Sequence, residues 1–230
     1  MDKCLFCGRE ITTQLNWNWL LSFNTLDLPV ICNQCKQNFE LLGEENICPG
    51  CGRAQTGKTL CQDCLRWQEM GNHSLLNNRA LYAYDQFMKA YIQHYKFMGD
   101  YYWRLVFQAE FSQYIKTHFK HRWLFTTIPI DLQTESSRGF NQVDGLLSDI
   151  KTIKLLQYRE KENRVKQSTK TRRERMETIQ PFVYCGTSEL NGLKVVLLDD
   201  IYTTGRTLYH AKDILEQHGA RLVRSVTLAR

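Results

Sequence analysis

The sequence predicts an α/β fold, a parallel sheet flanked by helices, preceded by a small cysteine-rich module. Eight of the nine cysteines lie before residue 65, whereas the chain after residue 77 alternates between β-rich runs and helical stretches. Such alternation is typical of a parallel sheet covered by helices. The run Leu193–Leu198 is apolar except for Lys194, as expected for a central strand buried on both faces. We therefore expect two domains, residues 1–72 and residues 73–230.

The individual elements follow from residue type and periodicity. Runs rich in β-branched and aromatic residues predict the strands Arg79–Tyr84, Trp123–Ile130, Pro181–Cys185, Lys194–Leu198 and Arg221–Leu228. Helical spacing predicts the helices Asp85–Met98, Tyr101–His118, Gln142–Ile150 and Thr207–His218. Around the first helix, residues three and four apart form one apolar face, expected in the core: Tyr84, Phe87, Met88, Tyr91, Ile92 and Tyr95. Aromatic rings that remain exposed could instead stack on nucleobases. For the aromatic residues 101–103, both core packing and base stacking stay open.

Composition and charge narrow the class of protein. A hydrophobic fraction of 43% and a charged fraction of 23% indicate a globular protein. The first residues lack the apolar core of a signal peptide, and no apolar run approaches the ~20 residues of a spanning helix, so we expect a cytoplasmic location. Residues 151–175 hold ten basic and three acidic residues, a local charge of +7 within a chain of net charge +6. This basic segment predicts a phosphate-bearing partner, unless it is simply a solvated loop.

The cysteine spacing predicts metal binding. In a reducing compartment, paired cysteines are more often metal ligands than disulfides. Two CxxC pairs complete the tetrahedral coordination that zinc prefers, so four pairs predict two structural zinc ions. The four pairs are Cys4/Cys7, Cys32/Cys35, Cys48/Cys51 and Cys61/Cys64. Sequential pairing would join the first two pairs and the last two, and an interleaved arrangement is also open.

One match to a nucleotide-binding pattern is excluded by its context. Residues 52–59, GRAQTGKT, fit the pattern GxxxxGK followed by Ser or Thr. That pattern binds phosphates only between a buried strand and a helix. Here it lies between Cys51 and Cys61, which leaves no room for either element, so we do not expect an ATP site.

A phosphate site is predicted at the end of the central strand. Asp199 and Asp200 follow the apolar run at its carboxyl end, where open α/β sheets bind their ligands. The next residues, Thr203, Thr204, Gly205, Arg206 and Thr207, open a helix. Small residues let backbone N–H groups approach a phosphate, and the helix N-terminus adds its positive end. The two carboxylates suit the vicinal hydroxyls of a ribose, so we expect a site for ribose 5-phosphate, as in phosphoribosyl pyrophosphate (PRPP).

These residues carry a family resemblance. Residues 195–207, VVLLDDIYTTGRT, resemble the PRPP-binding motif of type I phosphoribosyltransferases. Together with the four CxxC pairs, three further segments resemble the ComF family of bacterial competence proteins: residues 94–100 (HYKFMGD), residues 138–142 (RGFNQ), and residues 166–168 (KQS) with 174–175 (ER). The resemblance spans almost the whole chain. It implies a type I phosphoribosyltransferase-like sheet behind an N-terminal double zinc ribbon.

The resemblance also implies roles for two loops. Residues 129–142, with Arg138 and Gly139, would meet pyrophosphate. The basic segment would close over PRPP, which is bound with Mg²⁺, and would meet anions or DNA through Gln167, Lys170, Arg172, Arg173 and Arg175. The family usually has a second proline and basic residues before RGFNQ. This chain has Asp131 and Glu135 there, which predicts weak pyrophosphate binding.

Two functions follow as expectations. Membership of the ComF family implies a DNA uptake factor in natural transformation, which handles incoming single-stranded DNA. Its zinc module would dock DNA or a partner such as a helicase-like ATPase of the ComFA type, and the uptake machinery could recruit it to the inner face of the membrane. The alternative is an active phosphoribosyltransferase that transfers phosphoribosyl from PRPP to an amine or nucleobase. The sequence identifies no catalytic residue and no acceptor pocket for it.

Overall fold

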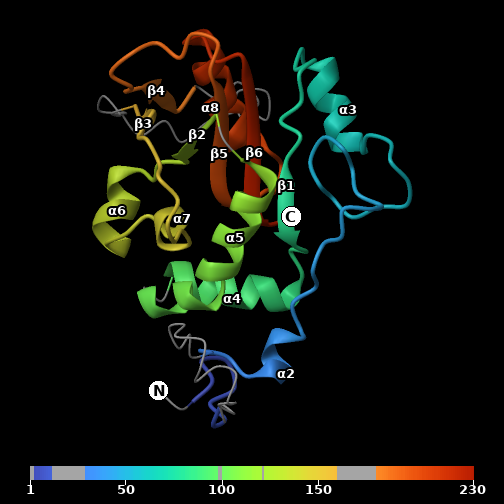
Figure 1. Ribbon diagram of the computed structural model, residues 1–230, viewed down its shortest axis with the longest axis vertical. Coiled ribbons are helices and arrows are strands. Elements are labelled where there is room, and N and C mark those ends of the chain that lie inside the picture. Colours follow the sequence, from blue (N-terminus) through green and yellow to red (C-terminus); the bar gives the residue numbers. More distant parts are fainter. Residues whose placement is uncertain (1–2, 12–28, 98–99, 121, 160–179) are drawn as a thin grey trace, which may run out of the picture.

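A four-stranded parallel sheet forms the centre of the molecule (Figure 1). The computed structural model describes residues 3–11, 29–97, 100–120, 122–159 and 180–230. The strand order is β1-β6-β5-β2, and all three pairings are parallel. The strands are β1 (Arg79–Tyr82), β2 (Trp123–Thr127), β5 (Lys194–Ile201) and β6 (Leu222–Ala229). The predicted parallel sheet flanked by helices is thus confirmed.

The central strand β5 separates two hydrophobic cores. Its side chains alternate between the two faces of the sheet. Val196 and Leu198 join a core that contains residues of α4 (Gln86–Phe97) and α5 (Gln108–His118). Val195 and Leu197 join a second core that contains residues of α8 (Arg206–Gln217). Burial on both faces explains why residues 195–198 of this strand are all apolar.

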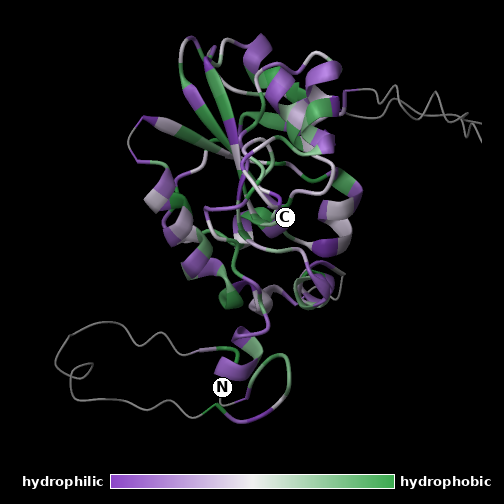
Figure 2. Ribbon diagram, turned by 90° about the vertical axis from the view of Figure 1, so that its right-hand side faces the viewer, coloured by the Kyte–Doolittle hydropathy of each residue, from purple (hydrophilic) through white to green (hydrophobic). Residues whose placement is uncertain are grey.

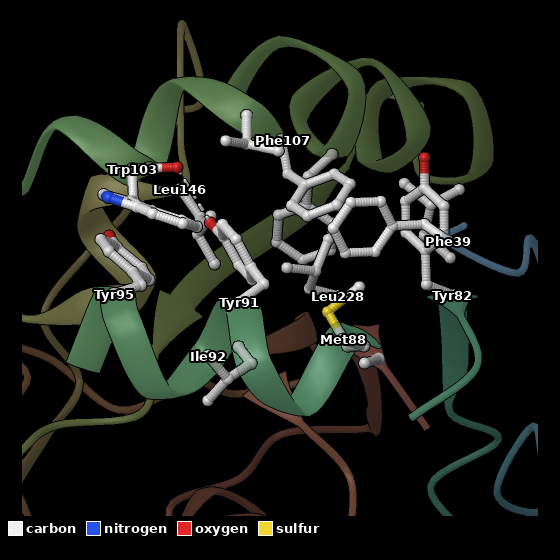
Figure 3. Packing of buried hydrophobic residues seen from close by; sticks show 14 of the residues in the cluster. Phe39, Tyr82, Met88, Tyr91, Ile92, Tyr95, Trp103, Phe107, Leu146 and Leu228 are labelled. Carbon is white, nitrogen blue, oxygen red and sulfur yellow. Dashed lines mark hydrogen bonds between the residues drawn. The ribbon is translucent and has the colours of Figure 1, made fainter. Parts of the chain in front are cut away.

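Aromatic side chains dominate the first core (Figure 3). One face of α4 places Met88, Tyr91 and Tyr95 against the 3₁₀ helix η1 (Tyr101–Val106) and the start of α5. The rings of Tyr91 and Phe107 meet edge to face, with centroids 4.8 Å apart. Trp103 of η1 also belongs to this core.

Five of the six residues predicted on this face lie in or against the core, whereas Tyr84 is 37% exposed. The prediction for Tyr84 is wrong because α4 begins only at Gln86, so Tyr84 is not on the helix face. Of the aromatic residues left open, Trp103 is buried and Tyr101 is exposed.

Several predicted boundaries are corrected. The helix expected over residues 101–118 is divided into η1 and α5 at Phe107, whose φ of −128° is not helical. The helix expected over residues 142–150 is only the short α7 (Gln142–Gly145). The strand expected at residues 181–185 is β4 (Phe182–Tyr184), which pairs antiparallel with β3 (Leu156–Tyr158) outside the main sheet. An additional helix, α6 (Leu132–Arg138), occupies part of the predicted pyrophosphate loop.

The two N-terminal cysteine groups lie against opposite sides of this framework. The first, with the short helix α2 (Asn33–Lys36), stands at one end of the molecule in both views (Figure 1 and Figure 2). Cys4 and Cys35 belong to the core of α4 and α5. The second group, whose last cysteine lies in α3 (Gln62–Glu69), is found beside β1 and shares the core of α8. The boundary between residues 72 and 73 stays a prediction. Within the described part of the chain, no helix has the length and apolar character needed to cross a membrane.

Candidate functional site

The predicted acid pair lies at the carboxyl end of β5. Asp199 and Asp200 are 8% and 3% exposed. Asp199 accepts a hydrogen bond from the backbone N–H of Asp200 at 2.9 Å. Burial raises the pKa of Asp199 well above its usual value, and the charge of Asp200 adds to this effect. Two carboxylates held this closely out of water would gain from a ligand that supplies hydroxyl donors or a cation.

Lys96 supplies a counter-ion that the sequence analysis did not assign. This residue, on the last turn of α4, forms an ion pair with Asp200 and is only 17% exposed. Its charge opposes the rise in the pKa of Asp199. Lys96 belongs to the segment HYKFMGD, which was noted for its resemblance alone. The structure therefore adds Lys96 to the candidate site.

Arg138 binds protein groups next to this pair. Its Nε donates to the backbone oxygen of Lys96 at 3.0 Å, and its Nη1 donates to the side chain of Gln142. Gly139 follows with φ +79° and ends α6. The arginine expected to meet pyrophosphate thus connects α6, α7 and the end of α4.

Residues 202–207, called here the phosphate turn, connect β5 to α8. Thr203, Thr204, Arg206 and Thr207 are exposed, whereas Gly205 is buried with φ +80° at the N-cap of α8. A Cβ on Gly205 would clash with the hydroxyl of Tyr202, so the turn requires glycine. Within the described residues, the backbone N–H groups of Thr203, Thr204 and Gly205 donate to no protein acceptor. Free N–H groups at the start of a 12-residue helix are suited to binding an anion.

A cavity of about 340 Å³ lies at the carboxyl end of β2, next to β5. Thr127 in its wall pairs in register with Leu198, the residue before the acid pair. The charged groups that line it are Glu135, Asp144 and Lys154. Two carboxylates against one ammonium group make the charge of this wall unfavourable for an anion. The weak pyrophosphate binding expected of residues 129–142 stays a prediction.

The eight cysteines of the CxxC pairs form two separate groups, in the sequential pairing. The first cluster is Cys4, Cys7, Cys32 and Cys35, and the second cluster is Cys48, Cys51, Cys61 and Cys64. In each cluster all four sulfur atoms lie within 4.8 Å of one another. Neighbouring sulfur atoms are 3.6 Å apart for Cys48 and Cys64 and 3.7 Å apart for Cys7 and Cys32. A tetrahedron with Zn–S bonds of 2.3 Å has edges of roughly 3.8 Å, so both clusters fit zinc.

Neighbouring groups lower the pKa of particular thiols in each cluster. A hydrogen bond from the backbone of Arg9 lowers the pKa of Cys7 to about 6. A contact with Cys64, followed by the guanidinium of Arg230, lowers the pKa of Cys51 to about 4. In the same clusters, burial raises the pKa of Cys35 and Cys61, and the contact with Cys51 raises the pKa of Cys64. Each cluster therefore holds at least one thiol that favours the thiolate, the form that binds metal.

The proposed loop contacts Gln167, Lys170, Arg172, Arg173 and Arg175 lie outside the described residues. The chain on either side of them is described. Arg159 donates its backbone N–H to Pro181 at 2.8 Å, and Gln180 donates to the backbone oxygen of His210 in α8 at 2.9 Å. The described residues that precede and follow residues 160–179 are therefore held close together, beside the helix that begins at the phosphate turn.

Comparison with known proteins shows which family this chain belongs to. The family model of the phosphoribosyl transferase domain matches residues 137–230, which include β5, the phosphate turn and α8. Competence protein ComFC of Streptococcus pneumoniae is 37% identical over 228 residues, which are 99% of this chain and 100% of that protein. Competence protein ComFC of Bacillus subtilis is 32% identical over 237 residues, covering 99% of this chain and 94% of that protein. Since these matches run the whole length of a chain with this fold and two Cys4 clusters, the chain belongs to the ComFC family of competence proteins.

Proposed function

We propose that this chain is a DNA uptake factor in natural transformation, which handles incoming single-stranded DNA and binds PRPP at the phosphate turn. The observation that carries the ligand assignment is the buried acid pair beside a turn with free N–H groups. The turn would hold the 5-phosphate, and Asp199 and Asp200 would accept hydrogen bonds from the ribose hydroxyls. Carboxylate oxygens are also ligands that Mg²⁺ prefers, so Mg²⁺ would enter with PRPP.

Single-stranded DNA would bind elsewhere, because its sugar lacks one of the hydroxyls that the acid pair suits. The basic segment supplies the charge for the phosphate backbone. The nearest described residues, Arg159 and Gln180, lie beside β4 and α8, the helix that begins at the phosphate turn. This placement would let PRPP and DNA bind as neighbours.

Neutralising four cations of the basic segment should weaken binding of single-stranded DNA and flatten its salt dependence. Changing Lys170, Arg172, Arg173 and Arg175 to Gln should reduce the slope of log affinity against log salt by about 3, since each lost phosphate contact removes about 0.7. Fluorescence anisotropy of a labelled single strand, titrated at low and near-physiological salt with duplex competitor, measures this. The control with the same charge loss changes four exposed lysines elsewhere to Gln: Lys58, Lys89, Lys116 and Lys120. An equal loss of slope in both chains would remove the segment from the DNA site.

The first cluster is proposed as the docking site for a helicase-like ATPase of the ComFA type. It stands at one end of the molecule, and Asn33 and Gln37 around α2 are exposed. Asn33→Arg with Gln37→Arg should abolish co-purification with the ATPase, because two added charges would be buried unpaired at the interface. Gln113→Arg with Gln133→Arg, exposed on α5 and α6, is the matched control. Retained co-purification of the first variant would place the partner on another surface.

The alternative is an active phosphoribosyltransferase, which the cavity beside β5 favours because its volume would admit a nucleobase acceptor. The wall of this cavity would disfavour the departing pyrophosphate, because it carries two negative side chains, Glu135 and Asp144, and one positive side chain, Lys154. Arg138 is already hydrogen-bonded to Lys96 and Gln142. We therefore rank PRPP binding without rapid turnover first. Release of pyrophosphate from PRPP in the presence of amines or nucleobases would reverse that ranking.

A further inference from the structure

We infer that Trp67 and Arg230 position the phosphate turn from the second cluster, so that PRPP binding and metal retention in that cluster are coupled. This inference rests on the proposed function, since it takes PRPP as the ligand of the turn. It assigns a role to two residues that no motif singled out. It also distinguishes the two cysteine clusters, because only the second cluster would position the phosphate turn.

Trp67 connects the second cluster to the middle of the turn. It lies on α3, which is preceded by Cys61 at its N-cap and contains Cys64. Its indole N–H donates to the backbone oxygen of Thr204 at 2.9 Å. Its ring stacks on Tyr209 in the first turn of α8, with centroids 4.1 Å apart. One side chain therefore contacts both the turn and the helix that the turn opens.

Arg230 makes the second connection. Its Nη1 donates to the backbone oxygens of Tyr202 and Thr203, at 3.2 Å and 2.9 Å. Its Nη2 donates to the sulfur of Cys51 at 3.3 Å. The side chain is only 6% exposed, and the backbone of Arg230 is hydrogen-bonded to both Tyr82 and Tyr84. The guanidinium is therefore a fixed bridge between a cluster sulfur and the turn.

These three bonds determine where the N–H groups of the turn point. In a trans peptide the carbonyl and the following N–H point in opposite directions, and the described chain has no cis peptide. Holding the oxygens of Tyr202, Thr203 and Thr204 toward Arg230 and Trp67 directs the next three N–H groups away from the cluster. Those are the N–H groups of Thr203, Thr204 and Gly205, which have no protein acceptor in the described residues. The second cluster thus preorganises the phosphate site.

The first cluster provides an internal comparison. Its residues pack with the core of α4 and α5, and Lys36 beside Cys35 pairs with Glu110 of α5. In the ranges that the structure covers, it makes no hydrogen bond to the phosphate turn. Because coupling between two sites is reciprocal, PRPP should therefore stabilise metal in the second cluster and leave the first unaffected.

The test is the rate at which zinc leaves the chain for a chromophoric chelator, with and without PRPP and Mg²⁺. PRPP should slow the release of one of the two zinc ions by about tenfold in the wild-type chain. Trp67→Phe keeps the ring on Tyr209 and removes the N–H, and Arg230→Gln removes the bridge. Each should retain both zinc ions, bind PRPP about tenfold more weakly by calorimetry, and lose most of the protection.

Two control variants at the first cluster test whether the effect is specific to the second cluster. Arg9→Gln, beside the first cluster and bonded to Gln34, should leave both PRPP affinity and protection unchanged. Cys4→Ser removes a ligand of the first cluster, and its remaining zinc should still be protected by PRPP. Wild-type chain that binds PRPP without protecting either zinc would overturn the coupling alone, as would unchanged PRPP affinity in Trp67→Phe and Arg230→Gln. No PRPP binding to the wild-type chain would overturn the proposed ligand, and the coupling with it.

Discussion

Asp199→Asn should abolish PRPP binding and, at neutral pH, raise the melting temperature of the protein. The loss of binding follows because a carboxyl group that accepts from the ribose hydroxyls is replaced by an amide, and the expected loss of affinity is about 100-fold or more. The gain in stability follows because burial, and after it the charge of Asp200, raise the pKa of Asp199. A rise of about 3 °C in Tm, equivalent to about 1 kcal/mol for a chain of this size, is the expected scale.

The sign of the pH dependence follows from linkage. A carboxyl group whose folded pKa lies above its unfolded value binds its proton more tightly in the folded state. The wild-type chain should therefore lose stability as the pH rises above the ordinary value of 3.8, and the variant should lose less. The difference in Tm between the two chains should vanish below pH 3.8 and grow as the pH rises.

Calorimetry with PRPP and thermal melts between pH 3 and pH 8 would measure both effects. Asp213→Asn is the matched control, because burial also raises the pKa of Asp213 on α8. It should gain some stability and bind PRPP normally. Normal PRPP affinity in folded Asp199→Asn would remove Asp199 from the site, and a lower Tm at pH 7 would contradict the account of its burial.

The phosphate turn and the cysteine clusters could be predicted because their signals are local. A buried strand, two acids, a glycine and a helix follow one another within residues 193–218, in the order that a phosphate site requires. The CxxC pairs likewise contain two ligands of one metal within four residues. The helix α6 could also have been found, since Asp131 caps it by accepting from Thr134 and Gly139 ends it.

The partners of these sites could not be predicted, because they come from distant parts of the chain. Lys96 contacts Asp200, Trp67 contacts Thr204, and Arg230 contacts Cys51. In each pair the two residues are more than 100 positions apart in the sequence. No periodicity specifies such contacts. Phe107 is a similar case, since it leaves helical geometry at a fully buried position where the aromatic core decides its conformation.

Lys96→Met should be one of the most destabilising substitutions outside the cysteine clusters. The variant keeps the length and apolar stem of the side chain but leaves Asp200, which is 3% exposed, without its counter-ion beside Asp199. Removing one partner of a buried ion pair costs about 3–5 kcal/mol. Urea unfolding at pH 7 should therefore show a clearly lower midpoint with an unchanged slope.

A second substitution separates loss of the ion pair from loss of packing. Asp200→Asn in the Lys96→Met chain removes the stranded charge, so the double variant should recover most of the lost stability. Lys36→Met is the matched control: Lys36 pairs with Glu110, but both side chains are more than a third exposed, so the cost should stay below about 1 kcal/mol. If Lys96→Met and Lys36→Met cost the same, or if Asp200→Asn rescues nothing, Lys96 acts through packing and not as the counter-ion of the acid pair.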